Sequence, residues 1–198
     1  MKNKIILIII ILLLAGGAGY YIYNDLSPTR RVGESEEPQQ PVVEIPNLDR
    51  PINITVNLTK EAEEIIRKKI EELSSKLKEN PNLLDLWLDL GIYRKIIGDY
   101  EGAVEAWEYV SVVSPKNSTS FHNLGDLYAF YLKDYQKAEK NFLIAIENNP
   151  SQIFSYRSLY ELYRYAMKDD EKAKEILKKG IEINPDTSQD LKNLLDRF

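Results

Sequence analysis

Four prolines at nearly constant spacing constrain this chain more than any other feature. They stand at Pro81, Pro115, Pro150 and Pro185, 34 or 35 residues apart. Self-similarity at a fixed period of this length indicates a repeat architecture in which each unit is one supersecondary element. Because proline lacks the amide hydrogen that a continuing helix needs, and disfavours helix in the residue before it, each proline marks the end of a unit.

The residues between these prolines align in columns of similar size and polarity. Within each unit they recur at i, i+3, i+4 and i+7 on two successive segments, which predicts two amphipathic helices joined by a polar turn at Asp99, Asp134 or Asp169. Such helices bury their apolar faces only when the units stack. The columns are Trp87, Phe121 and Tyr156; Leu90, Leu124 and Leu159; Gly91, Gly125 and Tyr160; Ala103, Ala138 and Ala173; Trp107, Phe142 and Leu177; and Val110, Ala145 and Gly180.

This pattern resembles the tetratricopeptide repeat family, whose units carry aromatic, Leu-Gly, Tyr, Ala, aromatic, Ala and Pro positions at this period. The resemblance implies an all-α, right-handed helical solenoid of about three repeats, at 84–117, 118–152 and 153–187. It also implies that the first helix of each repeat lines a concave groove that binds a partner protein or peptide. The groove residues implied are Leu88, Ile92, Lys95, His122, Asp126, Ala129, Arg157, Glu161 and Arg164.

Three departures from the family pattern bear on the packing. The second and third repeats contain one extra residue before the turn aspartate, which predicts a longer or bulged first helix. The third repeat has Tyr160 where glycine is usual and Gly180 where alanine is usual. Arg94 stands in the first repeat at the position that Tyr128 and Tyr163 occupy in the others.

The groove positions allow two interpretations. Leu88 and Ile92 are candidate apolar anchors for a peptide, and they stand where chaperone-binding members of the family carry a polar clamp. Arg157 and Arg164 could each bind a carboxylate bidentately. Alternatively, both arginines pair with Glu161 along one solvated helix face.

Helices are also predicted on both sides of the repeats. Residues 59–80 have apolar residues at helical spacing after a capping Thr59, which predicts a capping helix or half repeat. Residues 188–198 are predicted to form a C-terminal capping helix, because the last repeat of a solenoid otherwise exposes its core edge.

The N-terminal segment 1–24 is predicted to be a transmembrane signal-anchor. Lys2 and Lys4 precede an uncharged run that reaches Tyr23, and 19 residues of helix extend roughly 28 Å, which is close to the thickness of a hydrocarbon core. Lysines on this side favour a cytoplasmic N-terminus and an extracytoplasmic repeat domain.

Two other interpretations of this segment stay open. The small residues around Ala18 could form a processing site, in which case the protein is cleaved and secreted. Arg30 and Arg31, beyond the far end of the run, weaken the charge asymmetry and leave a cytoplasmic C-terminus possible.

Residues 25–58 are predicted to form a flexible linker rich in proline and glutamate, because such a stretch buries too little apolar surface to offset the entropy of ordering. Within it, Ile52, Ile54, Val56 and Leu58 alternate with polar residues. This period predicts an extended segment that lies over the first helix, or a strand that pairs with a partner sheet.

Composition limits the function. The net charge of −5 and pI near 5.1 disfavour nucleic acid as a partner, and the chain contains no cysteine and one histidine, His122. No catalytic, metal-ligating or cofactor-binding pattern is present. The sequence therefore predicts a non-enzymatic, membrane-tethered scaffold that binds a protein or peptide. The alternative is a structural protein that self-assembles through stacked solenoids or paired transmembrane helices.

Overall fold

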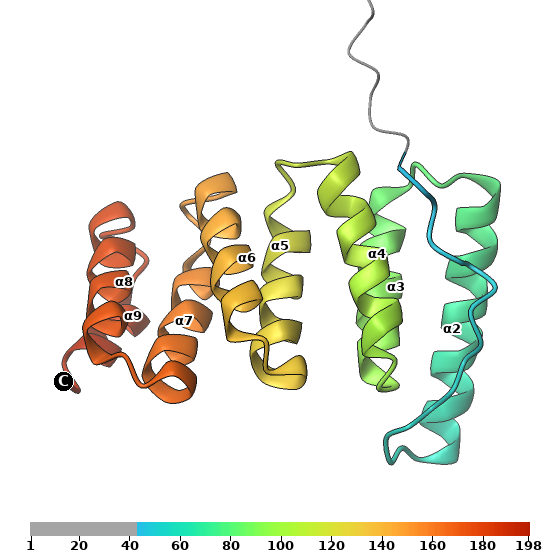
Figure 1. Cartoon of the computed structure of the whole chain (residues 1–198), viewed down its shortest axis with the longest axis horizontal. Coiled ribbons are helices and arrows are strands. Elements are labelled where there is room, and N and C mark those ends of the chain that lie inside the picture. Colours follow the sequence, from blue (N-terminus) through green and yellow to red (C-terminus); the bar gives the residue numbers. More distant parts are fainter. Residues whose placement is uncertain (1–42) are drawn as a thin grey trace, which may run out of the picture. The chain divides into compact units, whose positions relative to one another are not determined.

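The computed structural model describes residues 43–198 (Figure 1). The signal-anchor predicted over 1–24, and the part of the predicted linker before Val43, lie outside the described residues. None of the described helices is both long enough and apolar enough to cross a membrane. The elements are α2 (Lys60–Glu79), α3 (Leu84–Ile96), α4 (Tyr100–Val113), α5 (Ser118–Asp126), η1 (Leu127–Leu132), α6 (Tyr135–Asn148), α7 (Ile153–Glu161), η2 (Leu162–Met167), α8 (Asp170–Ile183) and α9 (Gln189–Leu195).

The helices form a solenoid, as predicted. α3 packs on α4, α5 with η1 on α6, and α7 with η2 on α8, and each hairpin packs on the next along the chain. Trp107, Phe142 and Leu177 belong to one column of the repeat and are all fully buried. The buried residues form two core clusters: one lies among α2, α3 and α4, and the other extends from Ala103 and Trp107 of the first repeat to Leu191 of α9.

The two end helices close this core. The Thr59 side chain accepts a hydrogen bond from the Ala62 amide at 3.2 Å and so begins α2, whose buried residues include Leu73 and Leu77. At the other end, α9 packs on α8 and buries Leu191 completely. Both helices cover edges that the first and last hairpins would otherwise expose.

The turn aspartates each begin the second helix of a repeat. Their carboxylates accept hydrogen bonds from the backbone amide three residues further on, which satisfies one of the free donors at a helix start. The distances are 3.0 Å from Gly102 N to Asp99, 3.1 Å from Lys137 N to Asp134, and 2.9 Å from Lys172 N to Asp169.

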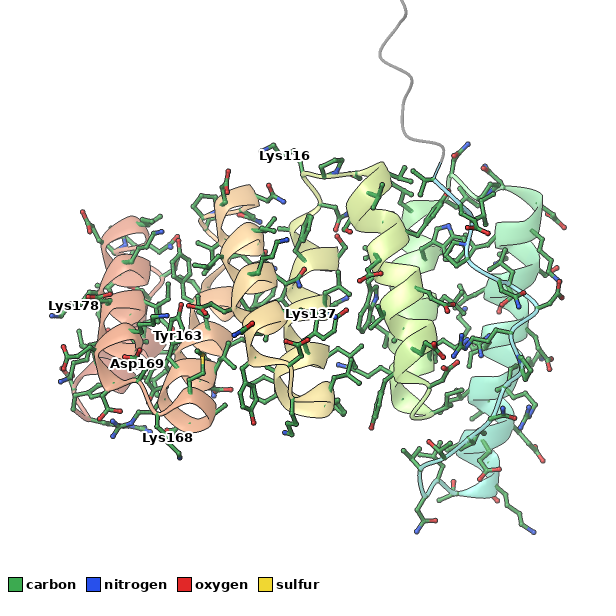
Figure 2. The ribbon with its side chains drawn as sticks, in the orientation of Figure 1. Lys116, Lys137, Tyr163, Lys168, Asp169 and Lys178 are labelled. Atoms are coloured by element: carbon green, nitrogen blue, oxygen red, sulfur yellow. The ribbon has the colours of Figure 1, made fainter. Side chains whose placement is uncertain are left out.

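The extra residue of the second and third repeats is accommodated by π-helical turns, η1 and η2. In the first repeat the Asp99 amide bonds the carbonyl of Arg94, five residues back, whereas the Asp134 amide reaches six residues back to Tyr128. Lys168 and Asp169 end the corresponding turn in the third repeat (Figure 2). The predicted bulge is thus confirmed in both repeats.

Each first helix ends with one residue in the left-handed conformation. Gly98 has φ 82°, Lys133 has φ 59° and Lys168 has φ 61°. Only glycine adopts this conformation without a steric cost from its Cβ. The two lysines are therefore held there by the turn, at some cost in stability.

Tyr160, at the glycine position of the third repeat, is explained by the size of the residue on the second helix. A Cβ on Gly91 would lie 2.2 Å from Trp107 Nε1, and one on Gly125 would lie 2.6 Å from Phe142. In the third repeat Leu177 replaces this aromatic residue, and Tyr160 occupies the glycine position. In this repeat the smaller Leu177 on the second helix, α8, thus leaves room for the larger Tyr160 on the first helix, α7.

The predicted linker is ordered from Val43 on, and this part of the linker prediction was wrong. We call residues 43–58 the strap. Its residues Leu48, Ile52 and Ile54 pack against the core of α2, α3 and α4, and Thr55 N donates to Ile97 O at 2.9 Å. The alternating side chains bury one face of an extended segment, which offsets the entropy of ordering it. The interpretation as a tail lying along the first helix is confirmed (Figure 1).

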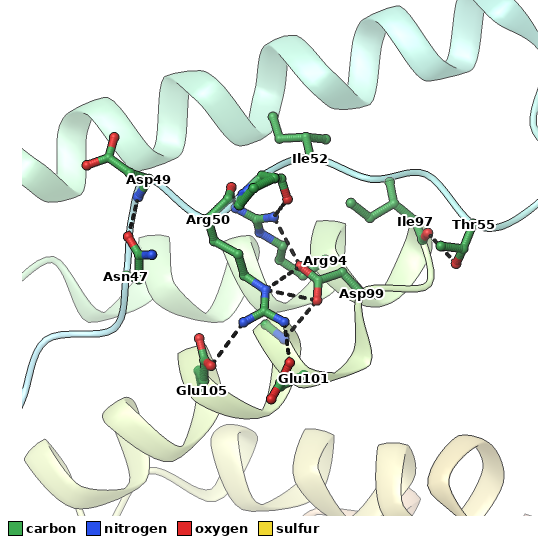
Figure 3. A network of polar contacts seen from close by, with 12 residues as sticks. Asn47, Asp49, Arg50, Ile52, Thr55, Arg94, Ile97, Asp99, Glu101 and Glu105 are labelled. Atoms are coloured by element: carbon green, nitrogen blue, oxygen red, sulfur yellow. Dashed lines mark hydrogen bonds and ion pairs between the residues drawn. The ribbon is translucent and has the colours of Figure 1, made fainter.

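Arg94 explains how the strap is held. The residue is only 2% exposed, and its side chain donates hydrogen bonds to Pro51 O and Arg50 O, both at 2.9 Å, and to the Asp99 carboxylate at 3.0 Å (Figure 3). Arg50 in turn bonds Asp99 and also Glu105 at 3.0 Å. Arginine, rather than tyrosine, stands here because the backbone carbonyls of the strap need donors.

The tyrosines of the same column contact the preceding repeat instead. Tyr128 donates to Glu108 at 3.3 Å, and Tyr163 donates to Glu139 at 2.8 Å. Burial raises the pKa of the Tyr128 hydroxyl to about 12, so it remains a donor at neutral pH. This column therefore joins each first helix to an earlier segment of the chain. That segment is the strap in the first repeat and the second helix of the preceding repeat in the other two.

Candidate partner-binding face

The positions predicted to bind a partner lie on α3, α5 with η1, and α7 with η2, the first helices of the three repeats. We call their solvent-exposed side the first-helix face. Ile92 on α3 is 39% exposed and belongs to it. Leu88 is only partly exposed and packs against both core clusters, and Ala129 is buried at 1% exposure.

Lys95 and Asp126 join the first two repeats across this face. Lys95 Nζ lies 3.0 Å from Asp126 Oδ2, and each side chain is about one-quarter exposed (25% and 27%). The ammonium also lies 5.5 Å from the Tyr131 ring centroid. Because its charge is satisfied by a carboxylate and an aromatic ring, Lys95 is not a free cation.

His122 joins the second and third repeats. Its Nδ1 lies 3.1 Å from Ser155 Oγ, and its ring packs edge-on against Phe154 with centroids 4.4 Å apart. Burial lowers the pKa of His122 to about 4, against a smaller opposing effect of the Asp126 charge. A neutral imidazole in this position packs two repeats together.

The charged groove residues of the third repeat are also paired. Arg157 Nε lies 3.1 Å from Glu161 Oε1 on the same helix, as in the solvated-face interpretation. Arg164 pairs with Asp170 rather than with Glu161, and its guanidinium lies 4.5 Å from the Phe198 ring centroid. A carboxylate ligand would have to compete with these contacts.

The predicted positions do not include several other exposed residues of the face. Asp85, Asp89 and Ile96 continue the Ile92 stripe along α3, and Phe154 on α7 is 49% exposed. The signal was available, because these residues lie three, four or seven positions from the predicted ones and so share their helix side. They lie outside the positions that the family pattern assigns to the groove.

No group of three or more histidine, aspartate or glutamate residues able to hold a metal ion occurs in the described part of the chain. The first-helix face instead offers exposed aliphatic and aromatic side chains among carboxylates and paired cations. Its chemistry suits contact with another polypeptide.

Comparison with known proteins agrees with this arrangement. A search of curated proteins gave no match. Among solved structures, the crystal structure of MamA is similar, with a TM-score of 0.55 and 23% sequence identity, over 71% of this chain and 89% of that chain. This likeness concerns the fold.

A stack of helical hairpins with one exposed first-helix face defines a helical-repeat protein. The model of the tetratricopeptide repeat family matches residues 118–152 and 161–187. The first range coincides with the second repeat predicted from the sequence. The chain therefore carries tetratricopeptide repeats over these residues.

Proposed function

We propose that this protein is a membrane-tethered scaffold that binds a partner protein or peptide on its first-helix face. The observation that carries the proposal is the composition of α3. On this helix Trp87 and Leu90 are buried in the core, while Ile92 and Ile96 are 39% and 40% exposed. Exposed apolar side chains that continue along one helix side are typical of an interaction surface.

The tether is proposed from the sequence. The uncharged run after Lys4 is long enough to span a bilayer, and the lysines before it favour export of the rest of the chain. The repeat domain would then bind its partner outside the cytoplasm. Scaffolding rather than catalysis is the usual role of tetratricopeptide repeats, and it agrees with the contacts of His122, whose imidazole is used in packing.

Site-specific photo-crosslinking in the full-length, membrane-bound chain tests the binding face. A photoreactive residue at Ile92 or Phe154 is expected to give discrete crosslinked products with another polypeptide. Val112 on α4 and Leu143 on α6 are matched controls, since they are similarly exposed (48% and 41%) but lie on second helices. Products of equal yield at all four positions would contradict the proposal, and products containing only a second copy would favour the self-assembling alternative.

Topology is tested separately with a C-terminal tag and protease added to intact cells or spheroplasts. An exported domain loses the tag while the untreated protein stays in the membrane at full mass. Protection of the tag until lysis would place the repeats in the cytoplasm. A soluble product shorter by about 2 kDa would establish cleavage near Ala18 instead.

A further inference from the structure

The exposed side of α3 combines two kinds of residue in order. Asp85, Asp89, Ile92 and Ile96 follow one another at i, i+4, i+7 and i+11, all four are exposed, and they therefore form one stripe. Its first part is acidic and its second part is apolar. At a rise of about 1.5 Å per residue the stripe is about 16 Å long.

The two aspartates have no cation to neutralise them among residues 43–198. The cations of α3 itself are used elsewhere. Arg94 is buried against Asp99 and the strap, and Lys95 is paired with Asp126. The stripe thus carries two negative charges beside an uncovered aliphatic pair.

Charge distinguishes α3 from the other first helices. On α7, Glu161 is neutralised by Arg157, and on α5, Asp126 is neutralised by Lys95. The uncompensated charge of the first-helix face is therefore concentrated at Asp85 and Asp89, next to its exposed aliphatic residues. Complementary charge on a partner would select this part of the face.

We propose that the α3 stripe binds a partner segment that is basic at one end and apolar at the other. Its lysine or arginine side chains meet Asp85 and Asp89, and its aliphatic side chains cover Ile92 and Ile96. This inference rests on the proposed function and names the chemistry of the partner at that face.

A second copy of this chain fits the stripe poorly. If two α3 helices met in parallel, the aspartates would face each other, and like charges in contact repel. If they met antiparallel, the aspartates would be buried against isoleucines without a hydrogen-bonding partner, which costs free energy. A basic segment avoids both problems.

Three synthetic peptides test the inference against the full-length protein in detergent. The first carries two lysines and two leucines at the spacing of the stripe, and is made in both sequence directions. The second has glutamates in place of the lysines, and the third has serines in place of the leucines. Titration followed by fluorescence anisotropy is expected to show the first peptide binding about ten-fold more tightly than either of the others.

Variants of the protein make the test specific. The double variant Asp85→Asn, Asp89→Asn is expected to bind the Lys/Leu peptide about ten-fold more weakly than the wild type. The control is the double variant Asp186→Asn, Asp196→Asn, which removes two exposed carboxylates at the other end of the chain and should leave the affinity unchanged. Raising the salt from about 0.05 M to about 0.5 M is expected to weaken binding, because exposed charges are screened.

Equal or tighter binding of the Glu/Leu peptide, or no binding of the Lys/Leu peptide in either direction, would overturn the inference. The crosslinking experiment distinguishes failure of this inference from failure of the proposed function. Crosslinks from Ile92 to a partner, together with failure of the lysine peptide, would leave the binding face standing and reject only the basic chemistry. Failure of both experiments would reject both.

Discussion

Arg50 and Asp99 lie 49 residues apart in the chain, yet Arg50 Nε donates to both carboxylate oxygens of Asp99 at 3.1 and 3.0 Å. The same carboxylate caps α4 through the Gly102 amide and accepts a bond from Arg94. One turn aspartate therefore begins a helix and holds the strap against it. In the other two repeats the equivalent residues, Asp134 and Asp169, cap their helices in the same way.

Replacing Arg94 by alanine should destabilise the fold strongly. The substitution leaves two strap carbonyls without donors and removes one of the donors to Asp99, so we expect a loss of about 3 kcal/mol in the free energy of unfolding. Urea denaturation of residues 43–198 followed by circular dichroism measures it. Arg67→Ala is the matched control, because Arg67 is exposed and makes one bond to the strap, at Ile52 O. Equal losses of unfolding free energy in the two variants would show that the buried contacts of Arg94 contribute no more to stability than the exposed contact of Arg67.

Replacing either of the two lysines with a left-handed backbone conformation by glycine should stabilise the protein. Lys133→Gly and Lys168→Gly remove the Cβ strain at φ near 60°, and we expect each to raise the free energy of unfolding by about 0.5–1 kcal/mol. Lys116→Gly is the control: Lys116 is an exposed turn residue without positive φ, and glycine there only adds freedom to the unfolded chain. Destabilisation at all three positions would mean that the turns do not strain the lysines.

Alanine at Gly91 should be harmful because of Trp107. The new Cβ would overlap the indole nitrogen, which also donates to Leu88 O at 3.0 Å, and we expect a loss of about 2 kcal/mol. A double-mutant cycle with Trp107→Leu measures the coupling, since in the third repeat Leu177 stands at the position of Trp107 and a larger residue, Tyr160, stands at the position of Gly91. Additive effects would contradict a direct clash.

Stability should fall between pH 6.5 and pH 4 because of His122. Its pKa is lowered from 6.5 to about 4, so in this window the unfolded chain binds a proton that the folded chain does not. The contribution is complete above pH 6.5 and is lost as the pH falls, by up to about 3 kcal/mol.

The measurement is the free energy of unfolding of the wild type and of His122→Gln across this pH range. Glutamine is uncharged throughout, so the variant should show a shallower decline. Parallel pH profiles of the wild type and the variant would show that His122 has the same pKa in the folded and the unfolded chain, which would contradict the prediction.

Much of the fold could be predicted from local pattern. The spacing of Pro81, Pro115, Pro150 and Pro185 and the columns between them specify helix boundaries and buried faces, because both depend on short-range periodicity and on the backbone limits of proline. The extra residue before Asp134 and Asp169 likewise predicted a longer or bulged first helix, which the structure forms as a π-helical turn. The first-helix positions of the face came from the resemblance to the tetratricopeptide repeat family.

Only the tertiary structure decided which side chains from different elements contact one another. The strap has a linker-like composition, and its order depends on contacts with α2 and with Arg94, far away in sequence. Lys95 and Asp126 are 31 residues apart, and their pairing, which leaves Asp85 and Asp89 as the uncompensated charges of the face, depends on how the repeats stack. Periodicity determines each helix and its buried side, whereas pairing between elements depends on distances that only the packed solenoid sets.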